Sequence, residues 1–369
     1  MEDFFYGNAD SGGDNVVLGC RGGVGVRRLF IGLVILLPFL LGSCGGGEKI
    51  PDVSNIQVEI QSRRLDRDLA ALDTNKLVEG LRTLKGKYPD FLDFYLDTLM
   101  GFGVKGNYAD TSQAIQLGLR GFLTQKDYKG VFDTVAKHFP DTKKEEAALV
   151  KGFQFMKYYY PDYRVPKVVY LVTGLANWGA FTFGSGTVGI GLDMFLGANY
   201  PFYKSVDLPD YMGRHFSPAY MPVAVFSAIY QDRYPFVMES RNLLDMIIQK
   251  GKEQYFVSKM LPYAPDSVRL AYTQKQIDWC KHNEAEVYNF FIRENLFYSK
   301  DWQRILRYVN EGPNSTGMPP QSPGNIGSWL GLQIVRSYMQ KHPEMTLPQL
   351  LSQHEEPQVF LEESKYKPR

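Results

Sequence analysis

The sequence predicts an α+β fold that is predominantly α-helical and contains a small β-sheet. Apolar residues recur at helical spacing along most of the chain beyond residue 60. Between residues 168 and 192 the pattern changes to short apolar runs separated by glycines, which is typical of strands. No repeat, low-complexity tract or obvious linker interrupts the chain after residue 50, so we expect residues 51–369 to form a single domain.

The first half of that domain is expected to be helical after one strand. Residues 55–62 alternate between apolar and polar side chains, which predicts a strand. Asp73 is a suitable helix cap, and Asp110 with Thr111 would open a later helix. The expected helices cover about 74–86, 91–99, the residues after 111, and 142–160.

The middle of the chain is expected to hold the rest of the sheet. Residues 168–172 form an apolar, β-branched run that predicts a buried strand. Residues 180–183 and 187–192 flank Gly184-Ser185-Gly186, which predicts a hairpin. Helical patterns return after Pro209, and the longer ones cover about 244–255, 274–295 and 328–340.

The segment from Gly184 to Gly189 also fits the dinucleotide-binding pattern G-x-G-x-x-G. That site requires a βαβ frame in which a helix opens within the glycines. Here the preceding hundred residues are helical and residues 190–193 resemble a strand, so the sequence favours a glycine-bearing hairpin. No Walker loop and no G-x-S-x-G elbow is present. The sequence therefore predicts no cofactor and no catalytic residue.

Charge and composition exclude several classes of protein. The 369 residues include 41 basic and 40 acidic side chains, which gives no electrostatic reason to expect nucleic-acid binding. Three cysteines cannot build a disulfide scaffold. Five histidines are present, but none are spaced as H-E-x-x-H, so a zinc hydrolase of that type is excluded.

An export signal precedes the domain. Residues 29–41 are apolar, follow Arg27 and Arg28, and are too few for a membrane span of about 20 residues. Leu41-Gly42-Ser43-Cys44 matches the bacterial lipobox, so residues 1–43 are expected to be a signal peptide cleaved before a diacylated Cys44. Residues 44–50 would then be the lipidated cysteine and its tether. The alternative is a short hydrophobic segment with an incidental cysteine.

Two details qualify the signal. Residues 1–26 include four acidic side chains that do not suit a signal peptide's basic start, so translation could begin near Val24 or Val26. No acidic cluster and no Asp directly follows Cys44 in Gly45-Gly46-Gly47-Glu48-Lys49, which favours the periplasmic face of the outer membrane.

Three polar features are open to a chemical interpretation. Cys280 and His282 point apart on a helix, and His282 with Glu286 favours a surface ion pair over a metal site. Glu284 falls on an apolar helix face, either as a hydrogen-bonded core residue or as a functional acid in a groove. The glycine-containing stretch 322–329 opens a helix and could bind an anion or peptide terminus, although its glycines more simply permit close packing.

Several motifs of modest individual strength recur in order along the chain. They are residues 190–197, 242–248 with Gly251-Lys252, 260–262, Gln276, Trp279-Cys280, Asn283-Glu284, 322–338 and 364–368. Together with the lipobox, this set resembles the gliding-motility-associated lipoprotein GldB family of Bacteroidetes. The resemblance implies a cell-envelope lipoprotein with protein partners, required in gliding species for movement linked to type IX secretion, and no established catalytic activity.

The segments around residues 244–256 and 323–335 more weakly resemble a family of proposed zinc peptidases. Those proteins carry H-E-x-x-H on an earlier helix, where residues 222–230 here are PVAVFSAIY, and a glutamate where Lys250 stands. The resemblance therefore implies a peptidase-like scaffold without its metal ligands.

We expect a non-catalytic structural or interaction component of envelope machinery, held to the membrane through Cys44. If a groove is retained, its expected lining residues are Asp193, Lys250, Glu284, Trp329 and Arg336. The alternatives are a periplasmic hydrolase that uses carboxylates in an unrecognised site, and a solute- or peptide-binding lipoprotein with a pocket between two lobes.

Overall fold

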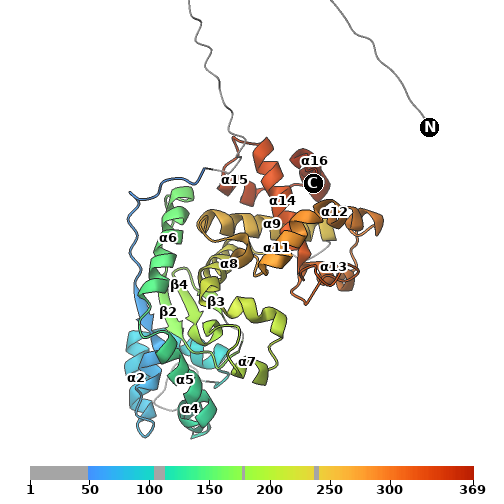
Figure 1. Ribbon diagram of the computed structural model, residues 1–369. Coiled ribbons are helices and arrows are strands. Elements are labelled where there is room, and N and C mark those ends of the chain that lie inside the picture. The colour runs from blue at the N-terminus through green and yellow to red at the C-terminus, as the bar shows by residue number, and fades with distance from the viewer. Residues whose placement is uncertain (1–48, 104–112, 177–178, 237–240) are drawn as a thin grey trace, which may run out of the picture. The chain divides into compact units, whose positions relative to one another are not determined.

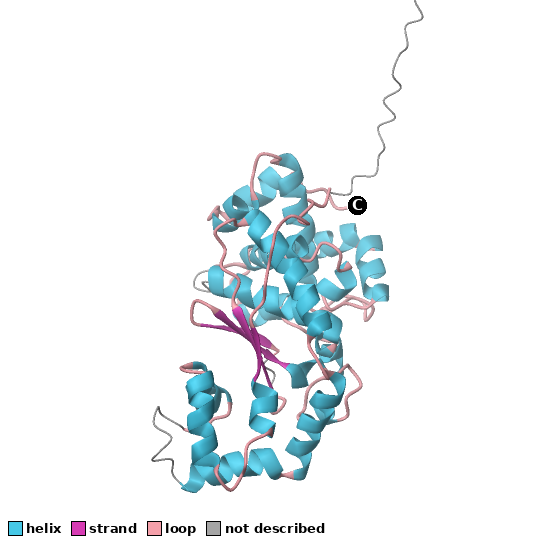
Figure 2. Cartoon of the chain, turned by 90° about the vertical axis from the view of Figure 1, so that its left-hand side faces the viewer, coloured by secondary structure: helices cyan, strands magenta, loops and turns pink. Residues whose placement is uncertain are grey.

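A four-stranded sheet lies between two groups of helices in the computed structural model, which describes residues 49–103, 113–176, 179–236 and 241–369 (Figure 1; Figure 2). Its strands, in spatial order, are β1 (Ser62–Arg64), β2 (Lys167–Leu171), β4 (Thr187–Gly191) and β3 (Ala180–Phe183). Strands β1 and β4 run parallel to β2, whereas β3 is antiparallel to β4. Because helices cover both sides of the sheet, β2 is buried from Val168 onward. The predicted buried strand and hairpin are confirmed.

The prediction of a strand at residues 55–62 was wrong in its position. Only Ser62 of that range belongs to β1, which pairs Ser62 with Val168 and Arg64 with Tyr170. Because β2 begins at Lys167, the residues before Gln61 have no neighbouring strand to pair with. Residues 55–60 therefore alternate between apolar and polar side chains but lack the backbone hydrogen bonds to a neighbouring strand that define a β-strand.

Helices α1 to α6 lie between β1 and β2 in the sequence. They are α1 (Leu65–Ala70), α2 (Leu77–Lys87), α3 (Phe91–Phe94), which continues into a π-helical turn (Tyr95–Leu99), α4 (Gln113–Thr124), α5 (Lys126–His138) and α6 (Lys143–Tyr159). The predicted helices at 74–86, 91–99 and 142–160 are confirmed, and Leu149, Phe153 and Met156 of α6 are fully buried as expected. The helix opening predicted at Asp110 lies outside the described residues.

The second half of the chain is almost entirely helical. After the 3₁₀ turn Leu192–Phe195 come α7 (Phe202–Ser205), the 3₁₀ turns Asp210–Phe216 and Pro218–Tyr220, α8 (Met221–Arg233), α9 (Leu243–Met260), α10 (Asp266–Arg269), α11 (Gln274–His282), α12 (Glu284–Arg293), α13 (Trp302–Val309), α14 (Ile326–Lys341), α15 (Leu347–Ser352) and α16 (Pro357–Ser364). Helices α9 and α14 form the most extensive pair, and residues of both are buried along most of their length.

The helix predicted at residues 274–295 is divided in two at Asn283. The backbone of Asn283 leaves the helical region, with φ −117° and ψ 22°. Its side chain Nδ2 donates to the Trp279 carbonyl at 2.8 Å, and its backbone N–H donates to the same carbonyl at 3.0 Å. Asparagine competes in this way for helical carbonyls, and so the apolar pattern continues through a break that periodicity alone does not reveal.

The predicted fold class, predominantly helical α+β, is confirmed. Residues 50–369 form one compact unit by their contacts. Among the residues that the structure describes, no helix has both the length and the apolar character needed to span a bilayer.

Candidate functional site

Asp193 is fully buried at the carboxyl end of β4, where it fixes the loop that follows β2. Its Oδ2 accepts hydrogen bonds from Thr173 N at 3.0 Å, Thr173 Oγ1 at 3.0 Å and Leu175 N at 2.8 Å, and its Oδ1 accepts from Thr173 N at 2.9 Å. Burial raises the pKa of this carboxyl, although the bonds from Leu175 and Thr173 oppose that shift. Leu175 is held at φ +62°, so Asp193 stabilises a strained loop.

Lys250 pairs with a glutamate of its own helix, whereas Glu284 contacts a distant part of the chain. Lys250 Nζ of α9 lies 3.6 Å from Glu253 Oε2, and Glu253 Oε1 also accepts from Gln231 Nε2 of α8 at 3.2 Å. Glu284, half-buried at the start of α12, accepts the hydroxyl hydrogen of Tyr366 at 2.7 Å. The carboxylate of Glu284 therefore holds the C-terminal segment of the chain.

Trp329 and Arg336 both lie on α14 but in different surroundings. Trp329 is 2% exposed and belongs to the hydrophobic core. Arg336 Nη2 donates to Asp266 Oδ1 at 3.1 Å, and Asp266 also pairs with Arg269. Burial would raise the pKa of Asp266, but the charges of Arg336 and Arg269 outweigh it and lower that pKa. The five predicted groove residues thus contact different parts of the chain, and their role in binding stays a prediction.

The glycines at the start of α14 serve close packing. A Cβ on Gly324 would lie 2.2 Å from the Gly312 carbonyl oxygen, and one on Gly327 would lie 2.9 Å from the Tyr308 carbonyl oxygen. Asn325, in the left-handed region at φ 54°, begins this helix and its Nδ2 donates to Glu311 Oε1 at 2.8 Å. The side chains at this helix start are therefore occupied by internal contacts.

A second polar cluster, which sequence reasoning missed, extends from the same place. His215 Nε2 lies 3.8 Å from Glu311 Oε1, and the His215 ring packs edge-on against Tyr220 at 4.7 Å between centroids. Burial lowers the pKa of His215, and the carboxylate of Glu311 opposes that effect. His215 and Glu311 are far apart in the sequence, so no motif brings them together; a histidine–carboxylate pair of this kind can hold or move a proton.

Neither metal nor thiol chemistry is indicated around Cys280. Cys280 is fully buried, and burial raises the pKa of its thiol, which makes it a poor nucleophile. His282 Nδ1 lies 2.6 Å from the Asp278 carbonyl oxygen. The ion pair expected between His282 and Glu286 is absent from the ion pairs of the described residues. Within those residues no group of three or more His, Cys, Asp or Glu side chains could hold a metal ion.

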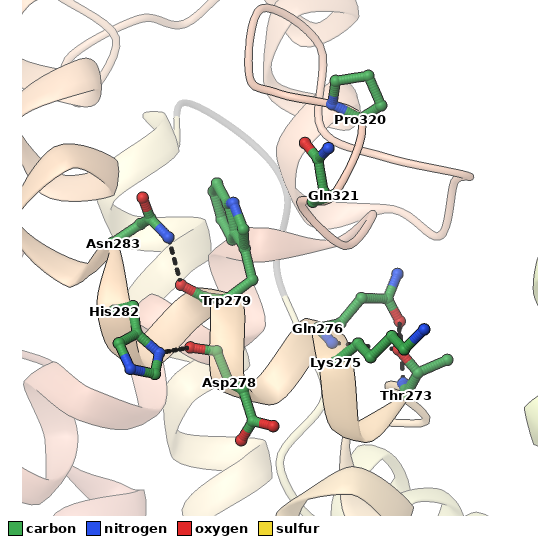
Figure 3. A pocket seen from close by; sticks show the side chains of 9 residues that line it. All are labelled: Thr273, Lys275, Gln276, Asp278, Trp279, His282, Asn283, Pro320 and Gln321. Atoms are coloured by element: carbon green, nitrogen blue, oxygen red, sulfur yellow. Dashed lines mark hydrogen bonds between the residues drawn. The ribbon is translucent and has the colours of Figure 1, made fainter.

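An open groove of about 490 Å³ lies between α11 and the loop that contains Pro320 (Figure 3). In the figure the indole of Trp279 rises from α11 toward Pro320 and Gln321. The groove is lined by Thr273, Lys275, Gln276, Asp278, Trp279, His282, Asn283, Pro320 and Gln321.

Three of these lining residues, Gln276, Trp279 and Asn283, stand at positions i, i+3 and i+7 of the α11 segment, so they share one side of the helix. Gln276 Oε1 is used by the capping box of α11, where it accepts from Thr273 N at 2.9 Å. The Asn283 side chain bonds the Trp279 carbonyl. These hydrogen bonds hold the Gln276 and Asn283 side chains at the two ends of α11. The arrangement suits noncovalent binding across an aromatic wall with polar margins.

The same three residues belong to the motifs that suggested a family from the sequence. Sequence reasoning identified them but did not place them in a groove, because the opposite wall comes from residues about 40 positions later. The spacing of these three residues on one helix face was the sequence feature that could have indicated a shared surface.

Comparison with known proteins supports the same family. The family model described as gliding motility protein GldB matches residues 46–368. No curated protein and no solved structure matches the chain. Because the match spans nearly all of the chain after the lipobox cysteine, the chain belongs to the GldB family of gliding motility lipoproteins.

Proposed function

We propose that this protein is a diacylated lipoprotein on the periplasmic face of the outer membrane, where it acts as a non-catalytic interaction component of gliding-type envelope machinery. The observation that carries the proposal is the position of the family match. It begins at residue 46, two residues after Cys44, so the family domain directly follows the lipobox cysteine. A diacylated cysteine suffices for stable membrane anchoring, and the domain then faces its partners from the membrane surface.

The α11 groove is the proposed partner-binding surface. It is wide and open, it carries an aromatic wall, and its polar residues lie at the margins, as in interfaces that use a buried aromatic anchor with a polar rim. The contacts of Asp193, Glu284 and Arg336 support a scaffold role for those polar side chains.

Membrane fractionation tests the anchor. The unchanged protein is expected in outer-membrane fractions, and the Cys44→Ala protein is expected to be absent from them. Continued association of Cys44→Ala with the outer membrane would contradict anchoring by lipid at this residue.

Crosslinking in intact cells, followed by affinity purification with the anchor in place, tests the partner surface. Trp279→Ala should lose the crosslinked partners, because the indole forms one wall of the groove. Trp302→Ala is the matched control, since Trp302 is 38% exposed and does not line the groove. Equal partner recovery from both variants would show that binding occurs elsewhere.

The contact between His215 and Glu311 favours a second candidate, a periplasmic hydrolase. Such an enzyme would use the pair as a general base. Hydrolysis of peptide or ester substrates by the purified protein, abolished in His215→Gln, would support this function and exclude a purely non-catalytic role.

A further inference from the structure

Large apolar side chains are exposed near the place where the domain begins. Tyr263, in the turn after α9, is 66% exposed; Tyr158, near the end of α6, is 48% exposed; and Ile50 is 38% exposed. We call these three residues, together with Lys151 of α6, the anchor-proximal face.

Contacts show that α6 and the turn after α9 form one continuous surface. Lys151 Nζ lies 5.9 Å from the ring centroid of Tyr263 and 5.7 Å from that of Phe155. The Phe155 and Tyr263 ring centroids are 6.1 Å apart. Tyr158 follows Lys151 by seven residues, about two helical turns, so both lie on the same side of α6.

The first described residues of the domain pass over this surface. The pKa of Asp52 is lowered, chiefly by its hydrogen bonds from Ser54 and in part by the charge of Lys151, which places Asp52 near Lys151. Four residues later, the Ile56 carbonyl accepts a hydrogen bond from Gln154 Nε2 of α6 at 2.9 Å. In Figure 1 the blue segment that starts at Ile50 passes one end of α6 and then runs beside the helix.

The length of the tether limits how far this surface can be from the membrane. Cys44 precedes Ile50 by six residues, and an extended chain of that length spans about 20 Å at most. A diacylated Cys44 would therefore keep Ile50, the first residue of the anchor-proximal face, within about 20 Å of the bilayer surface.

The chemistry of the face fits lipid headgroups. Tyrosine places an apolar ring and a polar hydroxyl at the boundary between hydrocarbon and water, and lysine extends its charged end toward the headgroups. Lys151 and Asp52 have opposite charges, so the charge of Lys151 is partly offset at this surface. Apolar and aromatic contact would therefore contribute more to adsorption than electrostatic attraction to anionic lipid.

We propose that the anchor-proximal face lies against the bilayer, with Tyr263 and Tyr158 at headgroup depth. This orientation rests on the proposed lipidation of Cys44. It would fix which side of the domain faces the membrane and would leave the α11 groove available to partners.

Spin-label accessibility in membranes tests the orientation. Mature lipidated protein would be reconstituted in vesicles of phosphatidylethanolamine and phosphatidylglycerol at a ratio of three to one, with a nitroxide attached at Tyr263→Cys. Cys280 is fully buried and its thiol pKa is raised, so labelling should be confined to the introduced cysteine. The matched control is Tyr298→Cys, which replaces a tyrosine of 54% exposure in the turn between α12 and α13, and Figure 1 shows those helices well away from α6.

A label at residue 263 is expected to be relaxed more strongly by oxygen, which partitions into lipid, than by a water-soluble nickel chelate. The label at residue 298 should show the opposite preference. Equal preference for the nickel chelate at both positions would overturn the orientation and would leave this face for water or a protein partner. Failure of the unlabelled lipoprotein to float with the vesicles would instead contradict the anchor itself, so the two failures are distinguishable.

Discussion

Gly251 of α9 and Gly331 of α14 lie in direct backbone contact where the two central helices cross. A Cβ built on Gly251 would lie 2.2 Å from the Gly331 carbonyl carbon, and one built on Gly331 would lie 1.9 Å from the Ile247 carbonyl oxygen. No side chain fits between the helices at this point. Each glycine is therefore required by its neighbour across the interface, and both belong to the segments that carried the family resemblance.

Gly331→Ala should destabilise the domain by about 3 kcal/mol, because the added methyl group must push two packed backbones apart. Urea unfolding followed by circular dichroism measures this change. Gly86→Ala in α2 is the matched control: nothing lies within 4 Å of its Cβ, so helix propensity should make it more stable by roughly 0.5–1 kcal/mol. Equal stability of the two variants would contradict the close crossing.

Asp193→Ala should cost about 3 kcal/mol of folding free energy, since it leaves the buried donors of Thr173 and Leu175 without an acceptor. Asp193→Asn should cost less, about 1 kcal/mol, because an amide oxygen at the Oδ2 position can still accept from three donors. Thermal and urea unfolding of the two variants check the order. A smaller loss of folding free energy in Asp193→Ala than in Asp193→Asn would contradict the conclusion that hydrogen bonds to this side chain hold the loop.

Lys252 should make stability depend on pH. Burial lowers the pKa of Lys252 to about 8, with the charges of Glu355 and Asp245 opposing the shift. Between pH 8 and 10 the unfolded chain keeps a proton on Lys252 that the folded protein has lost, so this group makes stability rise with pH in that window. The expected rise is about 2–3 kcal/mol.

Lys252→Met isolates this effect, because it removes the titrating group from both states. The difference in unfolding free energy between the two proteins should change steadily from pH 8 to pH 10 and stay constant below pH 7. The neutral side chain also loses the hydrogen bond from Lys252 Nζ to the Gln353 carbonyl, which lowers stability by a similar amount at every pH in that lower range. A pH-independent difference throughout would contradict a lowered pKa.

Tyr366→Phe should destabilise the C-terminal segment by about 1 kcal/mol, because it removes the hydrogen bond of 2.7 Å to Glu284 Oε1. Hydrogen exchange should show faster opening of α16 and of the start of α12. Tyr298→Phe, at a tyrosine that is 54% exposed, serves as the control and should leave exchange unchanged. Unchanged exchange in Tyr366→Phe would mean that Glu284 does not hold the tail.

Local pattern predicted many elements because helices and buried strands have characteristic side-chain periods. The stripe of Leu149, Phe153 and Met156 identified α6, and the apolar run from Val168 identified β2. The same reasoning misplaced β1, whose extent depends on where β2 begins to pair with it. It also missed the break at Asn283, where a side chain competes for a helical carbonyl without disturbing the apolar pattern.

The candidate site was predictable only in part. Gln276, Trp279 and Asn283 could be singled out as motif residues, but Pro320 and Gln321 complete the groove from a distant loop. His215 and Glu311 likewise meet only through the fold. Spacing along a chain does not report such pairs, because contact between distant segments depends on how whole helices pack.

The sequence by itself determined the helical α+β class, the lipobox at Cys44 as the predicted anchor, and the family to which the chain belongs. These features are local or ordered along the chain, so they need no knowledge of packing. Only the tertiary structure decided that Asp193 holds a loop, that Glu284 holds the C-terminal segment, and that Gly251 must meet Gly331. A side-chain pattern states which face of an element is apolar; the partner of each polar group on it is set by the elements that pack against that face.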